Sequence, residues 1–432
     1  SREPAGDAAL QLEILRRAER EVHELRDEEG ADAALAAAAR CDAAVDALFG
    51  TGLTRPLSGH FARLVEGLDA LGVPLAAVDL PSGLDGSRAE ILGPHAKADL
   101  TVTFAAPKIA HVLPPACDAM GEIEVVDLAI PPELVAEAPG SWHLLTQAET
   151  SAELMAAPPG AHKGTFGHAL VVGGGRGGSG AIALTARAAV RSGAGLVTAG
   201  VPSSLGPAVD RASAESMILP LPESAGALAE EAAAEILAAA RGKQALALGP
   251  GLGRSEGART AVRRAICESL APLVIDADGL NACAGHLEIF AGLEVPAILT
   301  PHPGEMARLL DSAVPAVEGD RPQAALELAA RTGATVVLKG RRSLIAAPGG
   351  ELWVNPTGNS GMATGGSGDV LTGVLAALLA QGYGPESAAR VGVYAHGLAG
   401  DLALPEKGRA GLAAGDLIAF LPAAWRALED PA

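Results

Sequence analysis

The sequence predicts an α/β protein built from two domains, residues 1–140 and 141–432. The chain has 432 residues, which is too long for one ordinary domain. Short apolar runs punctuated by Gly and Pro alternate with stretches of helical spacing along most of the chain. The alternation weakens between residues 130 and 146, where the composition is typical of a linker. The residues that indicate the linker are Pro131, Pro132, Pro139 and Gly140.

The composition bounds the kind of protein. Hydrophobic residues make up 49% of the chain, enough for sizeable cores, and the formal net charge of −19 argues against nonspecific binding to nucleic acid or anionic membranes. A small anionic ligand held by local dipoles remains compatible with that charge. No apolar run reaches transmembrane length. The four cysteines are scattered, with no pattern of a disulfide framework or a zinc site, which predicts a reducing, cytoplasmic location. They are Cys41, Cys117, Cys267 and Cys283.

In the first domain, residues 11–40 are charged and Ala-rich, and their rough helical spacing predicts a solvated surface helix. Three short apolar runs follow, which predict strands of a buried parallel sheet. These runs are Val73–Leu80, Leu100–Phe104 and Ile123–Leu128.

The second domain continues the alternation. Its predicted strands are Ala169–Val172, Leu196–Val201, Ala245–Leu248, Leu273–Ile275, Ala297–Leu299, Thr335–Leu338, Ser343–Ala346 and Leu352–Val354. Its predicted helices include Gly180–Ser192, Ala227–Arg241 and Arg321–Arg331. Ligands of such layered sheets bind at the carboxyl ends of the strands, so the loops that follow the strands are the candidates for function.

Two of these loops are rich in glycine. Gly173–Ala181 follows the first strand and opens a helix, as dinucleotide-binding loops do, but glycine-rich turns are common and the pattern is weak. Gly249–Gly253 follows the third strand. Each loop is either a tight turn for close packing or a wall of a ligand site.

Three further loops carry polar side chains. Asp276 and Asp278 follow a strand and either hold a metal or, for Asp278, cap the next helix. His302 lies between two prolines that restrict the backbone, which favours a ligand contact, whereas the nearby Glu305 suits the first turn of a helix. The basic loop Lys339–Ser343 suits a phosphate or a nucleotide, or is a solvated hairpin turn.

The most specific loop is Asn355–Gly373. It is dense in glycine, carries the single acid Asp369, and runs into an apolar pattern of helical spacing. Free backbone N–H groups at a helix start, with the positive end of the helix dipole behind them, form an anion site. A carboxylate in such a site is expected as a base beside a transferring phosphoryl group. We therefore predict that Asp369 is catalytic.

Together these loops resemble the ADP-dependent NAD(P)H-hydrate dehydratases, over about residues 141–432. The motifs that carry the resemblance are His162–Gly164, Gly173–Ala181, Arg191–Gly195, Gly249–Gly253, Asp276–Asn281, Thr300–Glu305, Lys339–Gly340 and Asn355–Gly373. The resemblance implies a ribokinase-like fold, and repair of NADHX and NADPHX, the hydrated forms of reduced nicotinamide cofactors, with ADP and Mg²⁺. Where this family carries Pro-Gly-Ala, the chain has Ser179-Gly180-Ala181, a change expected to alter stiffness more than chemistry.

The resemblance also implies roles for single residues. Asp369 would be the base, and the backbone N–H groups of the turn before it would stabilise the transferring phosphoryl group; these belong to Gly365, Gly366, Ser367 and Gly368. The substrate would contact Ala181, Gly253, His302 and Asp369. The AMP portion of the nucleotide would be bound by Lys339, Gly340, Arg341, Arg342 and Ser343, together with Gly368. A homo-oligomer is also expected from this resemblance.

The first domain resembles the NAD(P)H-hydrate epimerases, which implies a Rossmann-like three-layer α/β domain. The motifs are Asp46–Leu53, Val78–Gly83 and Thr103–Lys108. By resemblance Asp46 and Ser82 would bind K⁺, and the hydrate would contact Gly50, Thr51, Gly52, Leu53, Thr54, Arg55, Pro56 and Asp79. The family's Asn-Asn-Gly-Gly-Asp-Gly loop is not found in this sequence. The resemblance therefore implies a domain that is incomplete at its start, with its epimerase activity in question.

Three other functions compete with this interpretation. A kinase for a small molecule such as a vitamin precursor would share the fold and would accumulate a phosphorylated product. A non-catalytic nucleotide-binding protein would not need Asp369. A nicotinamide dehydrogenase would rest only on Gly173–Gly178 and would leave Asn355–Gly373 unexplained.

Overall fold

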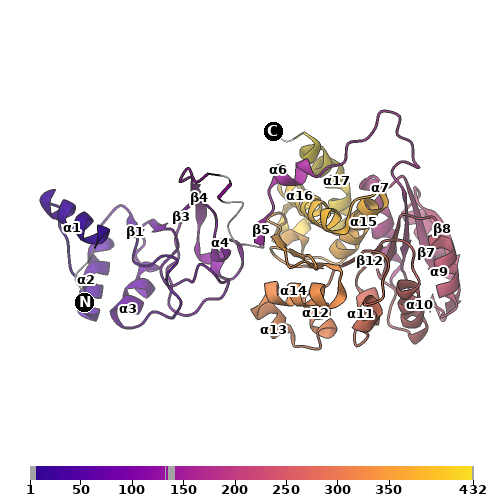
Figure 1. Cartoon of the computed structure of the whole chain (residues 1–432), viewed down its shortest axis with the longest axis horizontal. Helices are drawn as coiled ribbons and strands as arrows, with labels where there is room; N and C mark the ends of the chain where they lie inside the picture. Colours follow the sequence, from indigo (N-terminus) through magenta and orange to yellow (C-terminus); the bar gives the residue numbers. More distant parts are fainter. Residues whose placement is uncertain (1–5, 132, 135–141, 431–432) are drawn as a thin grey trace. The chain divides into compact units, whose positions relative to one another are not determined.

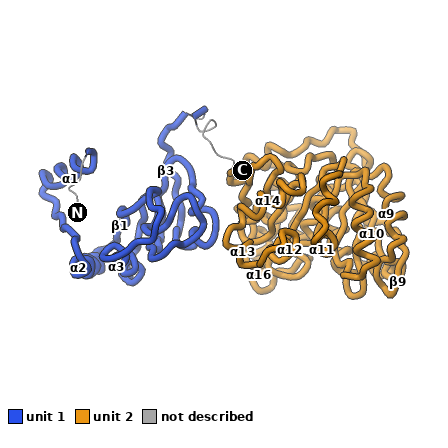
Figure 2. Tube along the Cα trace, turned by 60° about the horizontal axis from the view of Figure 1, so that its bottom comes forward, with its two compact units in different colours: residues 1–139 blue, residues 140–432 orange. Residues whose placement is uncertain are grey.

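The structure is a computed structural model that describes residues 6–131, 133–134 and 142–430. The chain divides into two compact units, Ser1–Pro139 and Gly140–Ala432, which Figure 2 colours separately. Part of the predicted linker, residues 132 and 135–141, lies outside the described residues. The two units are described one at a time below.

Unit 1 contains a four-stranded parallel sheet in the order β1-β2-β3-β4, which confirms the predicted α/β class and parallel pairing. Its strands are β1 (Ala44–Asp46), β2 (Leu75–Val78), β3 (Leu100–Phe104) and β4 (Glu122–Val126). Its helices are α1 (Asp7–Arg17), α2 (Glu28–Ala38), α3 (Gly59–Leu68) and α4 (Ile109–Val112), with a 3-10 turn at Ala116–Ala119.

Only one face of this sheet is covered by helices among the described residues. Leu75 on the covered face is buried with Val65 of α3, whereas Val45 and Val78 on the opposite face are 69% and 37% exposed. The prediction of strands buried on both faces is therefore wrong for the part of the chain that the structure describes. The alternation of buried and exposed side chains along β2 and β3 is the pattern of a half-covered sheet.

The single helical stretch predicted over residues 11–40 is two helices. The chain leaves helix after Arg17, and α2 begins behind Asp27, whose carboxylate caps the helix by accepting from the N–H of Gly30. Helix α1 buries none of its residues, as predicted for a solvated helix. Helix α2 packs on α3, where the side chain of Leu35 lies against Gly67.

Unit 2 is built on a ten-stranded sheet in the order β5-β16-β15-β14-β13-β12-β11-β6-β7-β8. All neighbours are parallel except β14–β15 and β15–β16, which are antiparallel. The strands are β5 (Trp142–Leu144), β6 (His168–Val172), β7 (Leu196–Pro202), β8 (Met217–Leu221), β11 (Ala245–Leu248), β12 (Leu273–Ile275), β13 (Ala297–Leu299), β14 (Thr335–Leu338), β15 (Leu344–Ala346) and β16 (Leu352–Val354). All eight strands predicted for this domain are present.

One predicted helix begins too early. Residues Ala227–Leu228 form strand β10, which pairs with β9 (Glu223–Ser224), and helix α9 spans only Ala232–Ala240. The turn between the two short strands consists of Ala225 and Gly226, both with positive φ (52° and 78°). A hairpin with a two-residue turn needs positive φ at both turn residues. The hairpin therefore determines the structure of this segment despite the helix propensity of the alanines that follow.

Two layers of helices enclose the sheet of unit 2 (Figure 1). One layer contains α7 (Ser179–Arg191), α15 (Ser367–Ala380), α16 (Pro385–Gly411) and α17 (Ala414–Glu429); the other contains α10 (Glu256–Cys267), α11 (Asp278–Cys283), α12 (Pro303–Leu309) and α14 (Arg321–Thr332), with α13 (Val314–Gly319) beside them. Unit 2 also contains the short helices α6 (Gln147–Ala152) and α8 (Gly206–Ala212). Among the described helices none is long and apolar enough to span a membrane.

Unit 2 begins at the far edge of its own sheet. Strand β5 pairs with β16, which lies more than 200 residues later. The segment that follows β5 is held by late parts of the chain: Arg390 makes a bidentate ion pair with Glu153 and stacks on Trp353, and the side chain of Gln147 donates to the carbonyl oxygen of Ala427. The start and the end of unit 2 therefore depend on each other.

The central helix α15 packs closely on α7 because Gly373 lacks a side chain. A Cβ at this position would lie 2.2 Å from the carbonyl oxygen of Thr185. We expect Gly373→Ala to lower the free energy of unfolding of unit 2 by about 1–3 kcal/mol, since overpacking outweighs the better helix propensity of alanine. Calorimetric melting of the full chain measures the shift.

Gly415 is the matched control. It is also helical, in α17, but a Cβ there would meet nothing within 4 Å. Gly415→Ala should leave the melting temperature unchanged or raise it slightly. A loss of stability equal to that of Gly373→Ala would contradict the packing argument.

Candidate active site

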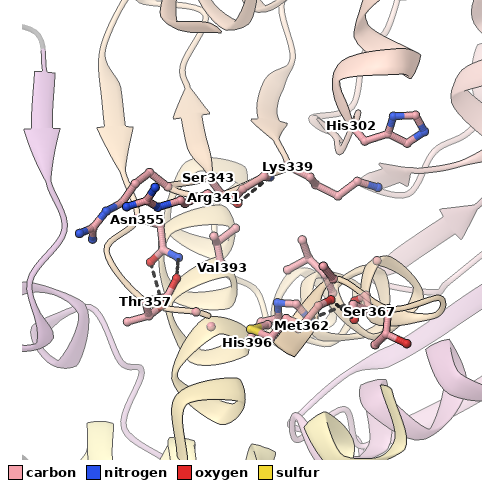
Figure 3. A pocket seen from close by; sticks show the side chains of 18 of the residues that line it. His302, Lys339, Arg341, Ser343, Asn355, Thr357, Met362, Ser367, Val393 and His396 are labelled. Atoms are coloured by element: carbon pink, nitrogen blue, oxygen red, sulfur yellow. Dashed lines mark hydrogen bonds between the residues drawn. The ribbon is translucent and has the colours of Figure 1, made fainter. Parts of the chain in front are cut away.

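A pocket of about 1040 Å³ opens at the carboxyl ends of the central strands of unit 2. It is lined by the loops after β12, β13 and β14, by the loop that leads into α15, and by one side of α16. Figure 3 shows His302 and the loop with Lys339, Arg341 and Ser343 on one wall, and Met362, Ser367 and His396 on the opposite wall. The pocket is at the upper end of the size range of small-molecule sites.

The structure gathers most of the predicted site residues in this pocket. They come from loops far apart in the sequence: His302, Lys339, Gly340, Arg341, Arg342, Ser343, Gly366, Ser367, Gly368 and Asp369 all line it. Asp276 and Glu305 line it as well. The loops meet because they follow neighbouring strands that run in the same direction.

Ala181 and Gly253 lie beside the pocket rather than in its lining. The hydroxyl of Thr185 is 3.0 Å from the carbonyl oxygens of both Ala181 and Asp369, so these two residues are close neighbours. The N–H of Gly253 donates to the carboxylate of Asp278 at 2.8 Å. Ala181 therefore lies near Asp369, and Gly253 lies beside Asp278.

Asp276 connects three elements of the site. Its carboxylate is buried and 2.5 Å from the ammonium group of Lys339 at the end of β14. Its second oxygen accepts a hydrogen bond of 2.7 Å from the hydroxyl of Thr372 in α15. This carboxylate thus fixes the distance between the strand ends and the start of the helix.

Lys339 faces several acids. Besides Asp276, a carboxylate oxygen of Glu305 lies 3.8 Å from its ammonium group, and Asp369 interacts with it electrostatically. Burial opposes the charge of Lys339, but the carboxylates of Asp276 and Glu305 outweigh burial and raise its pKa. Three carboxylates share one ammonium group, so the surroundings of Lys339 carry an excess of negative charge, while Arg341 and Arg342 also line the pocket.

Asp369 lies in the first turn of α15 with an unusual protonation equilibrium. Burial raises its pKa to about 6, repulsion from Asp276 adds to the rise, and Lys339 opposes it. A carboxyl group with a pKa near neutrality is suited to accept a proton and later release it. The observation agrees with the role of base that we predict from the sequence.

Helix α15 starts in the geometry of an anion site. Its N-cap is Gly366, with φ of 96°, and no side chain caps the first turn. The N–H groups of that turn are left without partners inside the helix. A side chain on Gly368 would approach the ammonium nitrogen of Lys339 to 3.3 Å, so the start of the helix lies directly against the Lys339–Asp276 pair. The hydroxyl of Ser367 is already used, because it donates to the carbonyl oxygen of Met362.

His302 is fixed by more than its flanking prolines. It is the N-cap of α12: its Nδ1 accepts from the N–H of Gly304, while its own N–H donates to the carboxylate of Glu305. Burial, together with the nearby charges of Lys339 and Arg308, lowers the pKa of the imidazole. His302 therefore presents a neutral ring at the pocket, and Glu305 is both a helix-capping acid and a partner of Lys339.

The basic loop is a hairpin turn and also a wall of the pocket. It joins the antiparallel strands β14 and β15 and closes on itself through the hydroxyl of Ser343, which donates to the carbonyl oxygen of Gly340. Arg342 donates to the carbonyl oxygen of Pro356, which ties this loop to the glycine-rich one. The hairpin interpretation of Lys339–Ser343 is therefore confirmed, and binding of a phosphate or a nucleotide by this loop stays a prediction.

Asp278 is not the cap of its helix. The N-cap of α11 is Ala277, and the carboxylate of Asp278 accepts instead from Gly253 and from the side chain of Asn281. The predicted role of Asp276 and Asp278 in holding a metal stays a prediction. Among the described residues no cluster of three or more acids, histidines or cysteines is placed to hold a metal ion alone.

The glycine loops Gly173–Ala181 and Gly249–Gly253 follow the neighbouring strands β6 and β11. The strands after β6 are added on one side of this pair and the strands after β11 on the other. A Cβ on Gly178 would lie 2.2 Å from the carbonyl oxygen of Gly251. The loops therefore pack directly against each other, which is the close-packing interpretation of both. The two loops end at Ala181, which lies near Asp369, and at Gly253, which lies beside Asp278.

In unit 1 the two residues predicted to bind K⁺ lie in direct contact. The buried carboxylate of Asp46 accepts from both the hydroxyl and the N–H of Ser82, at 2.6 and 2.7 Å. Gly50 lies beside Asp79, since a Cβ there would be 3.4 Å from its carboxylate. The start of the predicted Gly50–Pro56 contact loop thus lies at Asp79, and the substrate contacts of this loop stay a prediction.

Asp79 is held by groups to which the sequence assigns no role. The ammonium group of Lys108 is 2.7 Å from its carboxylate, the hydroxyl of Thr103 also donates to it, and His111 donates to its carbonyl oxygen. Burial favours the neutral acid, but the hydrogen bonds from Lys108 and Thr103 outweigh burial and lower the pKa of Asp79. Asp79 has a φ of 69°, in the left-handed region that few residues other than glycine adopt.

Sequence reasoning missed several residues of both sites. Lys108 stands in a quoted motif directly after a predicted strand, and that position was the available signal. Thr372 lies inside an apolar helix pattern, where one hydroxyl gives no signal of a partner 96 residues away. His396 lies in the middle of a helix and lines the pocket only because of how α16 packs.

Comparison with known proteins agrees with this geometry. A sequence profile of the NAD(P)H-hydrate dehydratases matches residues 169–423, and a profile of the N-terminus of YjeF-related proteins matches residues 2–110. The bifunctional NAD(P)H-hydrate repair enzyme of Moorella thermoacetica is 42% identical over 426 residues, covering 98% of this chain and 80% of that protein. The Escherichia coli enzyme of the same name is 34% identical over 380 residues, covering 88% and 71%.

Solved structures resemble unit 2. The ADP/ATP-dependent NAD(P)H-hydrate dehydratase of Bacillus subtilis, co-crystallised with ATP and Mg²⁺, matches with a TM-score of 0.59 and 32% identity, over 66% of this chain and 99% of that one. A ribokinase-like superfamily protein of Enterococcus faecalis matches with a TM-score of 0.58 and 25% identity, over 67% and 98%. The predicted ribokinase-like fold is confirmed.

The link from α15 to Asp276 should contribute measurably to stability. Thr372→Val keeps the shape of the side chain but removes the hydrogen bond to the buried carboxylate of Asp276. We expect the free energy of unfolding of unit 2 to fall by about 1.5–3 kcal/mol, because the acceptor is charged. Denaturant unfolding followed by circular dichroism measures the difference.

Thr335→Val provides the comparison. Thr335 is equally buried, and its hydroxyl has no hydrogen-bond partner among the residues that the structure describes. This substitution should be neutral or stabilising. If both valine variants lose the same stability, the loss does not come from the bond to Asp276.

Proposed function

The chain belongs to the family of bifunctional NAD(P)H-hydrate repair enzymes, and from this membership we propose that unit 2 uses ADP to dehydrate (S)-NADHX and (S)-NADPHX. The products are NADH or NADPH, AMP and phosphate. One observation carries the proposal: a carboxyl group with a raised pKa, Asp369, stands in the first turn of a helix that no side chain caps and whose start lies against the ammonium group of Lys339.

The first step is transfer of a phosphoryl group. The hydroxyl oxygen of the hydrate attacks the β-phosphorus of ADP, the bond to the bridging oxygen breaks, and AMP leaves. Asp369 takes the hydroxyl proton as the new bond forms. The N–H groups of Gly366, Ser367 and Gly368 stabilise the charge on the phosphoryl oxygens. The raised pKa of Asp369 supports this role, since a stronger base accepts the proton more readily.

The second step is loss of phosphate. The lone pair of the ring nitrogen expels the phosphate, and loss of a ring proton restores the dihydronicotinamide. Phosphate is a good leaving group and the nitrogen assists it, so no strong second acid is required. Ala181, Gly253 and His302 are proposed to hold the hydrate. The neutral ring of His302, the position of Ala181 near Asp369 and that of Gly253 beside Asp278 support this.

The nucleotide is proposed to bind along the hairpin Lys339–Ser343, with its phosphates toward the start of α15. Lys339 would serve the phosphates rather than the adenosine, because its ammonium group already faces Asp276 and Glu305 at that end of the pocket. Gly340, Arg341, Arg342 and Ser343 would hold the AMP portion.

A magnesium ion fits the charge of this site. Three carboxylates around one ammonium group leave an excess of negative charge, and Mg²⁺ takes many of its ligands from phosphates and water. Asp276 and Glu305 would supply the protein oxygens, directly or through water. When bound, the ion would neutralise charge on the phosphates.

For unit 1 we propose that K⁺ binds at Asp46 and Ser82, next to a hydrate site formed by Gly50–Pro56 and Asp79. Asp46 is buried and has no cationic side chain as a partner among the described residues, which suits a bound monovalent cation. Epimerisation of the (R) hydrate is the proposed reaction of this unit.

Asp369 variants test the main proposal. Purified protein given ADP, Mg²⁺ and (S)-NADHX should restore the absorbance of the dihydronicotinamide and release AMP and phosphate. Asp369→Asn keeps the shape of the side chain but cannot accept the proton, so kcat should fall by about 10²–10⁴. Asp210→Asn, an exposed acid in α8, serves as the control and should retain full activity.

The products also separate this function from a small-molecule kinase, which would accumulate a phosphorylated compound and no reduced cofactor. ADP and ATP are assayed in parallel. Full activity of Asp369→Asn would contradict the assignment of Asp369 as the base.

The pH dependence is a further test. The carboxyl group of Asp369 must be ionised to act as a base, and its pKa is raised to about 6, above the ordinary value near 4. The value of kcat/KM should therefore fall about tenfold per pH unit below pH 6 and stay level above it. A rate profile measured from pH 4.5 to 8.5 that stays level down to about pH 5 would contradict a raised pKa.

A further inference from the structure

A short segment of α16, residues 394–401, supports the glycine-rich loop from behind. The loop 355–367 is hydrogen-bonded to this segment near both of its ends, and His396 and Gly397 of the segment also line the pocket. Figure 3 shows Thr357, Met362 and Ser367 near His396 of this helix. The proposed function makes no use of the segment.

Two glycines allow the loop to lie flat on the helix. A Cβ on Gly397 would be 2.2 Å from the hydroxyl oxygen of Thr357, and a Cβ on Gly400 would be 2.3 Å from the sulfur of Met362. At such distances the loop would have to move. The backbone of the loop is therefore placed by direct contact with the helix surface.

Hydrogen bonds fix the loop at its first half. The carboxylate of Asp401 accepts from the N–H of Gly358 and from the side chain of Asn359, at 2.8 and 2.9 Å. The hydroxyl of Thr357 donates to the carbonyl oxygen of Tyr394 at 2.9 Å. These bonds set where the loop begins its path toward α15.

One hydrogen bond fixes the other end of the loop. Nε2 of the buried His396 lies 3.0 Å from the carbonyl oxygen of Ser367, the first residue of α15. Because a carbonyl oxygen only accepts, this nitrogen carries the proton. The carbonyl of Ser367 is thus held toward α16, which fixes the position of the first residue of α15.

We propose that His396 and Asp401 are positioning residues that hold the phosphate-binding turn Gly366–Asp369 in its working geometry. The inference rests on the proposed function, because the proposed function assigns binding of the transferring phosphoryl group to the turn Gly366–Asp369. Neither side chain is required to touch a substrate. A displacement of reacting groups by about 1 Å is enough to reduce a rate about 10²-fold.

A purely structural role predicts a different outcome. Removal of a buried hydrogen bond lowers stability whether or not the bond positions a catalytic group. A positioning role in addition lowers kcat of the folded protein while the KM for ADP changes little, since the hairpin Lys339–Ser343 still holds the nucleotide. The split between kcat and KM therefore separates the two roles.

The variants are His396→Leu, which removes the donor, and His396→Gln, whose amide keeps an N–H donor of similar reach. Asp401→Asn loses one of the two acceptor oxygens. His168→Leu is the matched control: it is a half-buried histidine with hydrogen bonds to Thr198 and Lys243 at the amino end of β6, away from the pocket.

For each folded variant we expect the following rates with ADP and (S)-NADHX. His396→Leu should lose about 10- to 100-fold in kcat with KM for ADP changed less than about threefold. His396→Gln should recover most of that loss, Asp401→Asn should lose about tenfold, and His168→Leu should keep the kcat of the wild type. Unchanged kcat in His396→Leu, equal losses in the leucine and glutamine variants, or a change confined to KM would each overturn the proposal. If His396→Leu does not fold, Asp401→Asn decides in the same way.

Hydrogen exchange keeps this test separate from the proposed function. Amides of the peptide that covers residues 355–367 should exchange faster in His396→Leu and Asp401→Asn than in the wild type, and at the wild-type rate in His396→Gln and His168→Leu. If the wild type forms no reduced cofactor with either nucleotide, the proposed function fails, and exchange alone decides whether the loop is held by α16. Unchanged exchange in both of the first two variants would refute the inference.

Discussion

The buried carboxylate of Asp276 is the contact on which the rest of the site depends. It binds the ammonium group of Lys339 from β14 and the hydroxyl of Thr372 from α15, while it is itself attached to the end of β12. A buried charge is stable only when such partners surround it, so the three elements cannot separate without a large loss of free energy. The same charge repels Asp369 and, together with burial, keeps that acid poised near neutrality. One interaction therefore sets both the shape and the chemistry of the pocket.

Much of the fold could be predicted from the sequence because the strands of unit 2 are buried on both faces. Such strands are short, continuous apolar runs ended by Gly or Pro, and runs such as Ala245–Leu248 and Leu273–Ile275 are found with the predicted bounds. The errors arise where local signals conflict with long-range contacts. The alanines after Ala227 favour a helix, but a hairpin turn with two positive φ values determines the start of that segment.

The candidate site was predictable only in part, for a related reason. Loops that follow parallel strands must meet, so the clustering of His302, Lys339 and Asp369 follows from the strand order once the sheet is recognised. Pairs formed across the sheet leave no such pattern. Nothing near Lys339 in the sequence indicates that its partners are Asp276 and Glu305, and nothing near Ser367 points to His396. These contacts depend on helix packing, which a single sequence does not reveal.

The pairing of β5 with β16 has a consequence for synthesis on the ribosome. Strand β5 cannot pair until β16 is synthesised more than 200 residues later, and Gln147 cannot form its hydrogen bond until α17 is synthesised. Loop closure over such separations is slow, and nascent chains emerge from the amino end. Unit 1, whose strands pair only with one another, has all its partners well before that. During translation the strands of unit 1 can therefore pair early, whereas the β5 edge of the sheet of unit 2 remains unpaired until most of the chain has been synthesised.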